Sequence, residues 1–209
     1  MSPVKTCKKT GMMAALIICA VLIADQVLKI WVKTHFYLGE DYPVTSWFHL
    51  KFIENNGIAF GIELPVKVLL TAGRLLAVGL LLWLISRLRG IRGLRTGFIA
   101  CVALITAGAL GNIFDCVFYG EIFNNPLPPG VASLCPAQGG YATWFEGRVV
   151  DMLYFPIFSI GDWEFFQYIF NIADASICVG VFTLILFYSK DFSIAWEQLS
   201  PRKSRQDAS

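Results

Sequence analysis

Four long apolar stretches constrain the fold of this chain more than any other feature of its sequence. A helix needs roughly 20 apolar residues to cross the hydrocarbon core of a bilayer, and the stretches that meet this length cover residues 12–33, 67–87, 96–118 and 169–190. Apolar residues make up 56% of the chain and charged residues only 15%, whereas soluble domains contain about 25% charged residues. The sequence therefore predicts an all-α membrane protein, with residues 1–209 forming a single domain around four transmembrane helices.

The first apolar stretch has a second interpretation as the hydrophobic region of a cleavable signal peptide. Lys5, Lys8 and Lys9 precede it, as basic residues precede such a region. We favour a spanning helix, because the pattern continues through residues 25–32 without a small-residue cleavage site.

The distribution of basic residues predicts the orientation of the helices. Lys and Arg are concentrated before the first span, between the second and third, and after the fourth. Because these residues are enriched on the cytoplasmic side of membrane proteins, these segments and both termini are predicted to be cytoplasmic. The loops at 34–66 and 119–168 then face outward, and between their boundaries Lys51 and Arg148 are the basic residues.

The two outer loops contain short segments with the pattern of β-strands. Residues 47–52 alternate between apolar and polar types, and Asn56-Gly57 separates them from a second apolar run at 58–60. An Asn-Gly pair between two such runs is typical of a hairpin. Residues 148–154 are also predicted to be extended, so we expect a small extracytoplasmic antiparallel β-sheet built from both outer loops.

A Pro/Gly-rich stretch at 120–147 opens the second outer loop and contains four prolines and five glycines. We expect it to be irregular. It could act as a lid, or it could be a tolerated surface insertion, which we slightly favour. Cys135 lies within it, and with Cys116 it forms the cysteine pair expected to face an oxidising compartment, so a disulfide is an open alternative.

Charged and amide side chains are concentrated near the outer ends of the predicted helices. Such groups in a membrane are functional candidates, because burying them in lipid costs free energy unless they face protein or water. The candidates from the residues alone are Asp25, Lys29, Asn112, Asp115, Asp151, Asn171 and Asp174. Asn112 and Asp115 share the spacing Asn-x-x-Asp with Asn171 and Asp174, which places an amide and a carboxylate on one helix face.

When two carboxylates share a site, repulsion between the two negative charges raises one pKa, so the pair holds one proton near neutral pH. This is the chemistry of an aspartic protease, in which the ionised group activates water and the protonated group polarises the peptide carbonyl. The residues alone do not exclude Asp115 from such a pair. Each Asn-x-x-Asp pair could also be a helix–helix contact, and Asp25 with Lys29 is best interpreted as a structural ion pair.

Metal chemistry is not indicated by the sequence. His35 and His49 are isolated, and the six cysteines include no CxxC spacing. The competing function classes are a small transporter with a carboxylate relay and a non-catalytic membrane scaffold. A transporter is expected to hold its polar groups near the bilayer midplane, whereas the candidates in this chain lie near one interface.

Five ordered segments resemble the lipoprotein signal peptidase family, the type II signal peptidases of bacterial membranes. They cover residues 25–29, 56–61, 108–115, 149–151 and 170–174. The resemblance implies a four-helix aspartic endopeptidase that removes the signal peptide from diacylglyceryl-modified prolipoproteins, cutting on the amino side of the lipid-modified cysteine. It also implies a location in the bacterial cytoplasmic (inner) membrane, with the active site near the extracytoplasmic face.

The resemblance assigns the catalytic dyad to Asp151 and Asp174. Residues expected to bind substrate or support the dyad are Asn56, Gly57, Ala59, Phe60, Asn112, Asp115, Asn171, Ala173 and Arg148. Residues expected to give structural support are Asp25, Lys29, Gly108 and Gly111, of which the glycines allow close helix approach. The expected partners are prolipoproteins, membrane lipid and globomycin-type inhibitors, with no cofactor, no metal, no nucleic acid and a monomeric state.

The chain departs from the family pattern directly after Asp115. Cys116 stands where the family usually has Arg, so a cation is missing at this position. Arg148 is the basic residue of the second outer loop, and we hypothesise that it supplies the missing charge.

Overall fold

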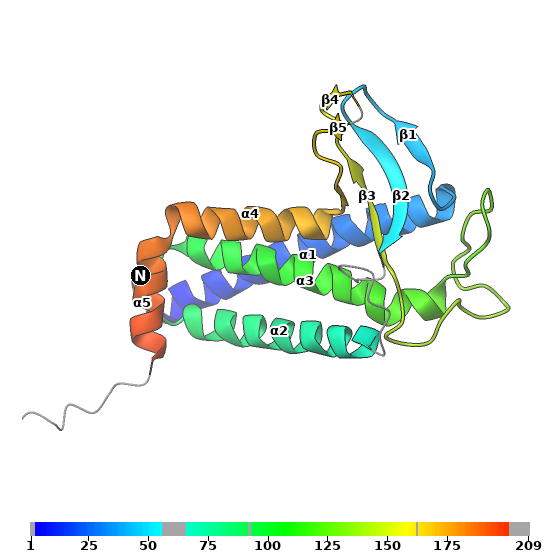
Figure 1. Ribbon diagram of the computed structural model, residues 1–209. Helices are drawn as coiled ribbons and strands as arrows, with labels where there is room; N and C mark the ends of the chain where they lie inside the picture. Colours follow the sequence, from blue (N-terminus) through cyan, green and yellow to red (C-terminus); the bar gives the residue numbers. More distant parts are fainter. Residues whose placement is uncertain (1–2, 56–65, 92, 162, 201–209) are drawn as a thin grey trace, which may run out of the picture.

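The computed structural model describes residues 3–55, 66–91, 93–161 and 163–200. Five helices are present in this part of the chain: α1 (Pro3–His35), α2 (Val66–Leu88), α3 (Thr96–Ile122), α4 (Ile172–Phe187) and α5 (Ser189–Leu199). Helices α1 to α4 lie side by side, with a small β-sheet at one end of the bundle and α5 across the other end (Figure 1). The arrangement places the two outer loops together, as the sequence predicts.

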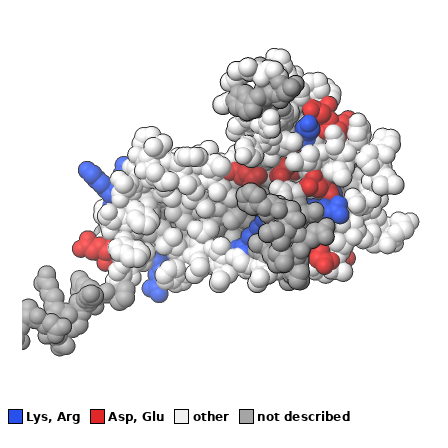
Figure 2. All heavy atoms as spheres, in the orientation of Figure 1, with Lys and Arg blue, Asp and Glu red and all other residues white. Residues whose placement is uncertain are grey.

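Three of the described helices are long and apolar enough to cross a membrane, namely α1, α2 and α3. In Figure 2, charged side chains gather at the two ends of the molecule, while the face between them is mostly uncharged. An apolar belt between two polar ends is the surface expected of a protein that spans a bilayer. The chain is therefore a multi-pass membrane protein.

The fourth predicted span requires a correction. Residues 169–190 were expected to form one helix, but Ile169 and Phe170 form strand β6, and α4 ends at Phe187. The chain then bends by 90° into α5, so α4 and α5 are long and apolar enough to cross a membrane only when the bent pair is taken as one span. The helix starts late because Asn171 caps it, and it ends early because Arg95 of the α2–α3 loop binds Asp191, which draws α5 across the bundle end.

Helix α3 is the central element of the bundle and packs most extensively against α4 and α1. Glycines allow this close approach. A Cβ atom at Gly108 would lie 2.2 Å from the Ala173 carbonyl oxygen, and one at Gly111 would lie 2.7 Å from Asp25 Oδ2. Both distances are too short for non-bonded atoms, so the α1–α3–α4 contact requires glycine at these positions.

The β-sheet has the strand order β1 (Asp41–Pro43), β2 (His49–Asn55), β3 (Val149–Tyr154) and β6 (Ile169–Phe170), and all its neighbours are antiparallel. Strands β1 and β2 come from the first outer loop and β3 and β6 from the second, which confirms the predicted small sheet. A separate two-stranded sheet joins β4 (Ser159–Ile160) to β5 (Trp163–Glu164).

Strand β2 begins two residues later than the alternating pattern at 47–52 predicts, and it continues through Asn55. Its partners are β1 and β3. The predicted turn at Asn56-Gly57 and the apolar run at 58–60 lie outside the described residues. The inner face of the sheet packs on the ends of α1 and α3 through a core that includes Val32, Phe52, Tyr119, Phe123, Val150 and Met152.

The Pro/Gly-rich stretch is irregular as predicted, except that its first three residues, 120–122, belong to α3. It folds back on the end of α3, where the Tyr141 amide donates to the Phe123 carbonyl at 2.9 Å. A bridge between Tyr37 and Val131 also ties it to the chain that follows α1. The structure contains no disulfide between Cys116 and Cys135.

Replacing Gly108 with Ala should destabilise the bundle, because the new Cβ would overlap the Ala173 carbonyl oxygen. Overpacking of this kind typically costs about 1–3 kcal/mol. Gly73→Ala on α2 is the matched control, since nothing lies within 4 Å of a Cβ there. We expect a clearly lower melting temperature in detergent for the first variant and little change for the second, and equal melting temperatures would contradict this account of the α3–α4 contact.

Candidate active site

The start of α4 fixes the position of Asp174. Asn171 is the N-cap, and its side-chain oxygen accepts a hydrogen bond from the Asp174 amide at 2.9 Å. The Asp174 carboxylate in turn accepts a hydrogen bond from the backbone amide of Asn171 at 3.3 Å, which completes a capping box. The carboxylate therefore lies in the first turn of α4, where the helix dipole favours a negative charge.

Two side-chain amides connect Asp174 to Asp151 of β3. The Asn171 side-chain amide donates to Asp151 Oδ1 at 2.6 Å, and it lies 3.1 Å from Asn112 Oδ1. The Asn112 side-chain amide donates to Asp174 Oδ1 at 2.8 Å. Both predicted Asn-x-x-Asp motifs thus meet at one place, and the amide of each motif holds one of the two carboxylates.

Lys29 determines the orientation of this amide network. Its ammonium group is fully buried and donates to Asp25 Oδ2 at 2.9 Å, Asp115 Oδ2 at 2.8 Å and Asn112 Oδ1 at 2.9 Å. An ammonium group has three N–H donors, and here each has an acceptor. Because Lys29 binds the oxygen of the Asn112 side chain, the nitrogen of that side chain must face Asp174.

Asp25 and Asp115, which both bind Lys29, also accept hydrogen bonds from the backbone beside the two candidate carboxylates. Asp115 Oδ2 accepts from the Val150 amide at 3.2 Å, next to Asp151 in the chain. Asp25 Oδ1 accepts from the buried Ala173 amide at 2.9 Å, next to Asp174. The ion cluster of Lys29, Asp25 and Asp115 therefore holds β3 and α4 at the positions where each presents its carboxylate.

Asp151 and Asp174 differ in environment. Asp151 is buried, while Asp174 is partly exposed. Burial and the nearby charge of Asp174 raise the pKa of Asp151 to about 7, although the hydrogen bond from Asn171 acts in the opposite direction. The pair is therefore expected to hold a proton near neutral pH on Asp151.

Arg148 does not supply the charge missing at Cys116. Its guanidinium donates to Glu54 Oε2 at 2.9 Å and lies over the ring of Tyr141. Glu54 also binds the buried ammonium of Lys33. Arg148 thus belongs to a structural cluster that joins α1, β2 and the Pro/Gly-rich stretch, and our hypothesis for it is not supported.

The cation that lies beside Cys116 is Arg74 of α2, whose Nη1 is 3.1 Å from Cys116 Sγ. It is not among the predicted site residues. Gln26 is a second residue that the sequence did not single out, although it lies in a matching segment. Its side-chain amide donates to Asp115 Oδ1 at 2.9 Å, and its oxygen accepts from the Tyr119 hydroxyl at 3.0 Å. The same sequence pattern could have identified Arg74 and Gln26 as candidates, because each is a polar residue inside an apolar stretch.

Four of the predicted site residues cannot be placed, because Asn56, Gly57, Ala59 and Phe60 lie outside the described residues. All the other predicted residues except Arg148 lie in or directly around the amide and ion cluster. In the described part of the chain, no group of three or more His, Cys, Asp and Glu side chains is arranged to hold a metal ion.

Known proteins resemble this chain over most of its length. Residues 17–190 match the family model described as signal peptidase (SPase) II. A lipoprotein signal peptidase of Porphyromonas gingivalis is 42% identical over 88% of this chain and 86% of its own length. One of Amoebophilus asiaticus is 33% identical over 86% of this chain and 78% of its own length. A solved structure of a bacterial membrane enzyme matches with a TM-score of 0.61 at 25% identity, over 85% of this chain and 93% of that one.

Removing the charge of Lys29 should strongly destabilise the protein. In Lys29→Met, the buried Asp25 and Asp115 would lose their cation, and breaking a buried ion pair costs about 3–5 kcal/mol. Lys51→Met is the matched control, because Lys51 lies 3.5 Å from Asp41 and both side chains are 34% exposed. Exposed pairs contribute about 0–1 kcal/mol. If thermal unfolding in detergent gave similar melting temperatures for both variants, Lys29 would not have the structural role described above.

Proposed function

This chain belongs to the signal peptidase II family, and from that premise we propose that it is an aspartic endopeptidase with Asp151 and Asp174 as its catalytic dyad. Membership of the family supports cleavage of signal peptides from prolipoproteins. One observation carries the assignment of the dyad. Asp25 and Asp115 are both bound to Lys29, whereas Asp151 and Asp174 are linked to each other only through amide donors and Asp174 is partly exposed.

The environments of the two carboxylates suggest their roles. Asp174, in the first turn of α4, acts as the base and removes a proton from a water molecule as the water oxygen attacks the peptide carbonyl carbon. Asp151, protonated, donates to the carbonyl oxygen and stabilises the tetrahedral intermediate. When this intermediate collapses, the C–N bond breaks and the leaving nitrogen takes the proton held by Asp174, while the oxygen returns its proton to Asp151. The dyad then again holds one proton.

The location of the dyad fits a lipid-modified substrate. Asp151 and Asp174 lie where the helical bundle meets the sheet, so a peptide bond could reach them at the membrane interface while attached acyl chains remain in the hydrocarbon. We propose that the substrate is a diacylglyceryl-modified prolipoprotein, cut on the amino side of the modified cysteine. The distribution of basic residues supports an extracytoplasmic site in the bacterial inner membrane. Globomycin-type inhibitors are expected to bind at the same place.

The proposal is tested by cleavage of a diacylglyceryl-modified precursor with the purified protein. Asp151→Asn and Asp174→Asn should each lower kcat/KM by at least about 100-fold, because each removes a proton-transfer group from the reaction. Asp41→Asn, which alters an exposed carboxylate of β1, should leave cleavage unchanged. Normal cleavage by either dyad variant, with melting temperatures equal to the parent, would show that the dyad is assigned wrongly.

Asp115→Asn separates catalysis from support. Asp115 binds Lys29 and the Val150 amide, so this variant should lose both activity and thermal stability. The dyad variants, in contrast, should lose activity with a smaller change in melting temperature. An Asp115→Asn protein with parental stability and no activity would indicate a direct catalytic role for Asp115.

A single proton on the dyad should make cleavage sensitive to pH near neutrality. Because the pKa of Asp151 is raised to about 7, kcat/KM should fall as the pH rises through that value and the proton is lost. Asn171→Ser keeps a capping oxygen but removes the amide that stabilises ionised Asp151. The fall in kcat/KM should therefore occur at higher pH in this variant, whatever its maximal rate. If kcat/KM fell at the same pH in the variant and the parent, the assignment of the proton to Asp151 would be contradicted.

A further inference from the structure

Most of helix α5 lies beyond the residues that match the family model. The match to that model ends at residue 190, and α5 covers Ser189–Leu199. The bend before α5 is fixed by Arg95, which donates to Asp191 through Nε and through its backbone amide, both at 2.8 Å. Asp191 is 2% exposed. Since α4 and α5 meet at 90°, α5 lies across the end of the bundle that is opposite the dyad (Figure 1).

The side chains of α5 divide into three groups around its axis. Asp191 and Ala195 are buried against the bundle. Lys190, Ser193 and Glu197 are exposed and polar, so they suit contact with water. Two large apolar side chains, Phe192 (63% exposed) and Trp196 (68% exposed), lie one turn apart beside the buried group. This pattern is typical of a helix that lies in the plane of a membrane interface.

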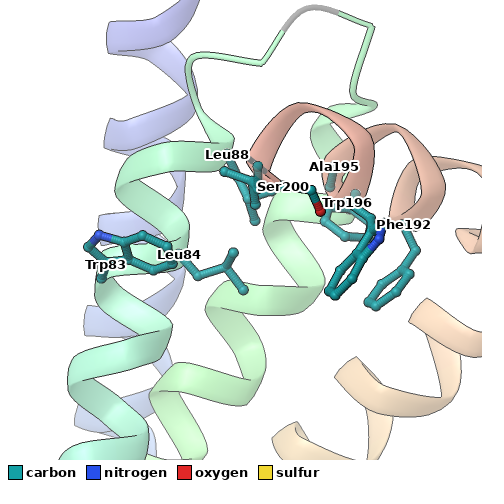
Figure 3. Close-up of a pocket in the computed structure, with 9 residues that line it drawn as sticks. Trp83, Leu84, Leu88, Phe192, Ala195, Trp196 and Ser200 are labelled. Carbon is teal, nitrogen blue, oxygen red and sulfur yellow. The ribbon is translucent and has the colours of Figure 1, made fainter. Parts of the chain in front are cut away.

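Two apolar grooves meet at this end of the molecule. The first has a volume of about 440 Å³ and its lining includes Trp83, Leu84, Leu88 and Trp196 (Figure 3). The second has a volume of about 430 Å³, and its lining includes Val181, Leu184 and Ile185 of α4. Phe98 and Phe192 line both grooves, so the grooves adjoin on the two sides of these rings.

The surroundings of the grooves are positively charged. Among the residues of this end whose side chains the structure describes, basic side chains outnumber carboxylates by six to two; the basic ones are Lys8, Lys9, Arg87, Arg89, Arg95 and Lys190. The guanidinium of Arg87 lies over the ring of Trp83, 5.5 Å from its centroid, and Trp83 lines the first groove. Arg87 forms no ion pair with any residue that the structure describes. A cation is thus present beside a side chain that lines an apolar groove.

We propose that this end binds one anionic phospholipid of the cytoplasmic leaflet, with an acyl chain in each groove and the phosphate at Arg87. Two adjoining apolar grooves of similar volume fit a molecule with two acyl chains. The lining side chains come from α2, α3, α4 and α5, and α2 and α4 expose large apolar side chains that surrounding hydrocarbon would cover. The excess of basic side chains matches an anionic headgroup, because each such residue near the surface favours anionic lipid. The site does not depend on the identity of the catalytic dyad.

The binding test uses the purified full-length protein in detergent and native mass spectrometry. Phosphatidylglycerol and phosphatidylcholine with the same acyl chains are added separately, and the bound fraction is measured for each. The parent should bind one phosphatidylglycerol in preference to phosphatidylcholine. Arg87→Gln should reduce this preference by about fivefold. Arg89→Gln is the matched control, because Arg89 lies against Gly11 of α1 and not beside Trp83, and it should keep the preference.

A second pair of variants tests the groove itself. Leu84→Trp should fill the first groove and lower the binding of both lipids, whereas Leu76→Trp, on an exposed part of α2 two turns away, should not. Equal binding of the two lipids by the parent would overturn the proposal. So would unchanged binding by Leu84→Trp, or the detection of a protein dimer in place of a lipid-bound monomer. Arg87→Gln changes an exposed side chain, so it remains informative if Leu84→Trp does not fold.

Discussion

A buried ammonium group is stable only when its three N–H donors all find acceptors, and Lys29 meets this condition with two carboxylates and one amide oxygen. These three acceptors come from α1 and α3, so the ion cluster first joins these helices. It then determines which way the Asn112 amide points, and through it the place of Asp174. The charge that looks least suited to a membrane helix is therefore the one that organises the polar end of the molecule.

The sequence predicted the parts of the fold that depend on length and composition. The bounds of α2 differ from the prediction by one residue at each end, because apolar length alone defines a span. The late start of α4 could not be predicted in the same way, since Ile169 and Phe170 are as apolar as the helix that follows, and their membership of β6 depends on pairing with β3. The bend into α5 depends on Arg95, which is far from Asp191 in the sequence.

The candidate site was predictable where its residues repeat a local pattern. Asn-x-x-Asp on two helices indicated an amide beside each carboxylate, and the structure brings these groups together. The pattern could not distinguish a carboxylate bound by Lys29 from one available to a substrate, which depends on contacts between helices. The partner of Arg148 could not be predicted either, because it also depends on contacts between distant elements. The pairing of β2 with β3 brings Glu54 opposite Val150, and this places a carboxylate within reach of the arginine.

The contacts that Asp25 and Asp115 make with α4 and β3 are to backbone amides and not to side chains. A backbone amide is present whichever residue occupies the position, provided that it is not proline. Side chains at 150 and 173 are therefore constrained only by the space around them. The direct adjacency of each amide to the carboxylate-bearing residue of the proposed dyad is constrained much more strictly. Evolution of this site should accordingly tolerate changes of residue type at these two positions while it excludes insertions and deletions there.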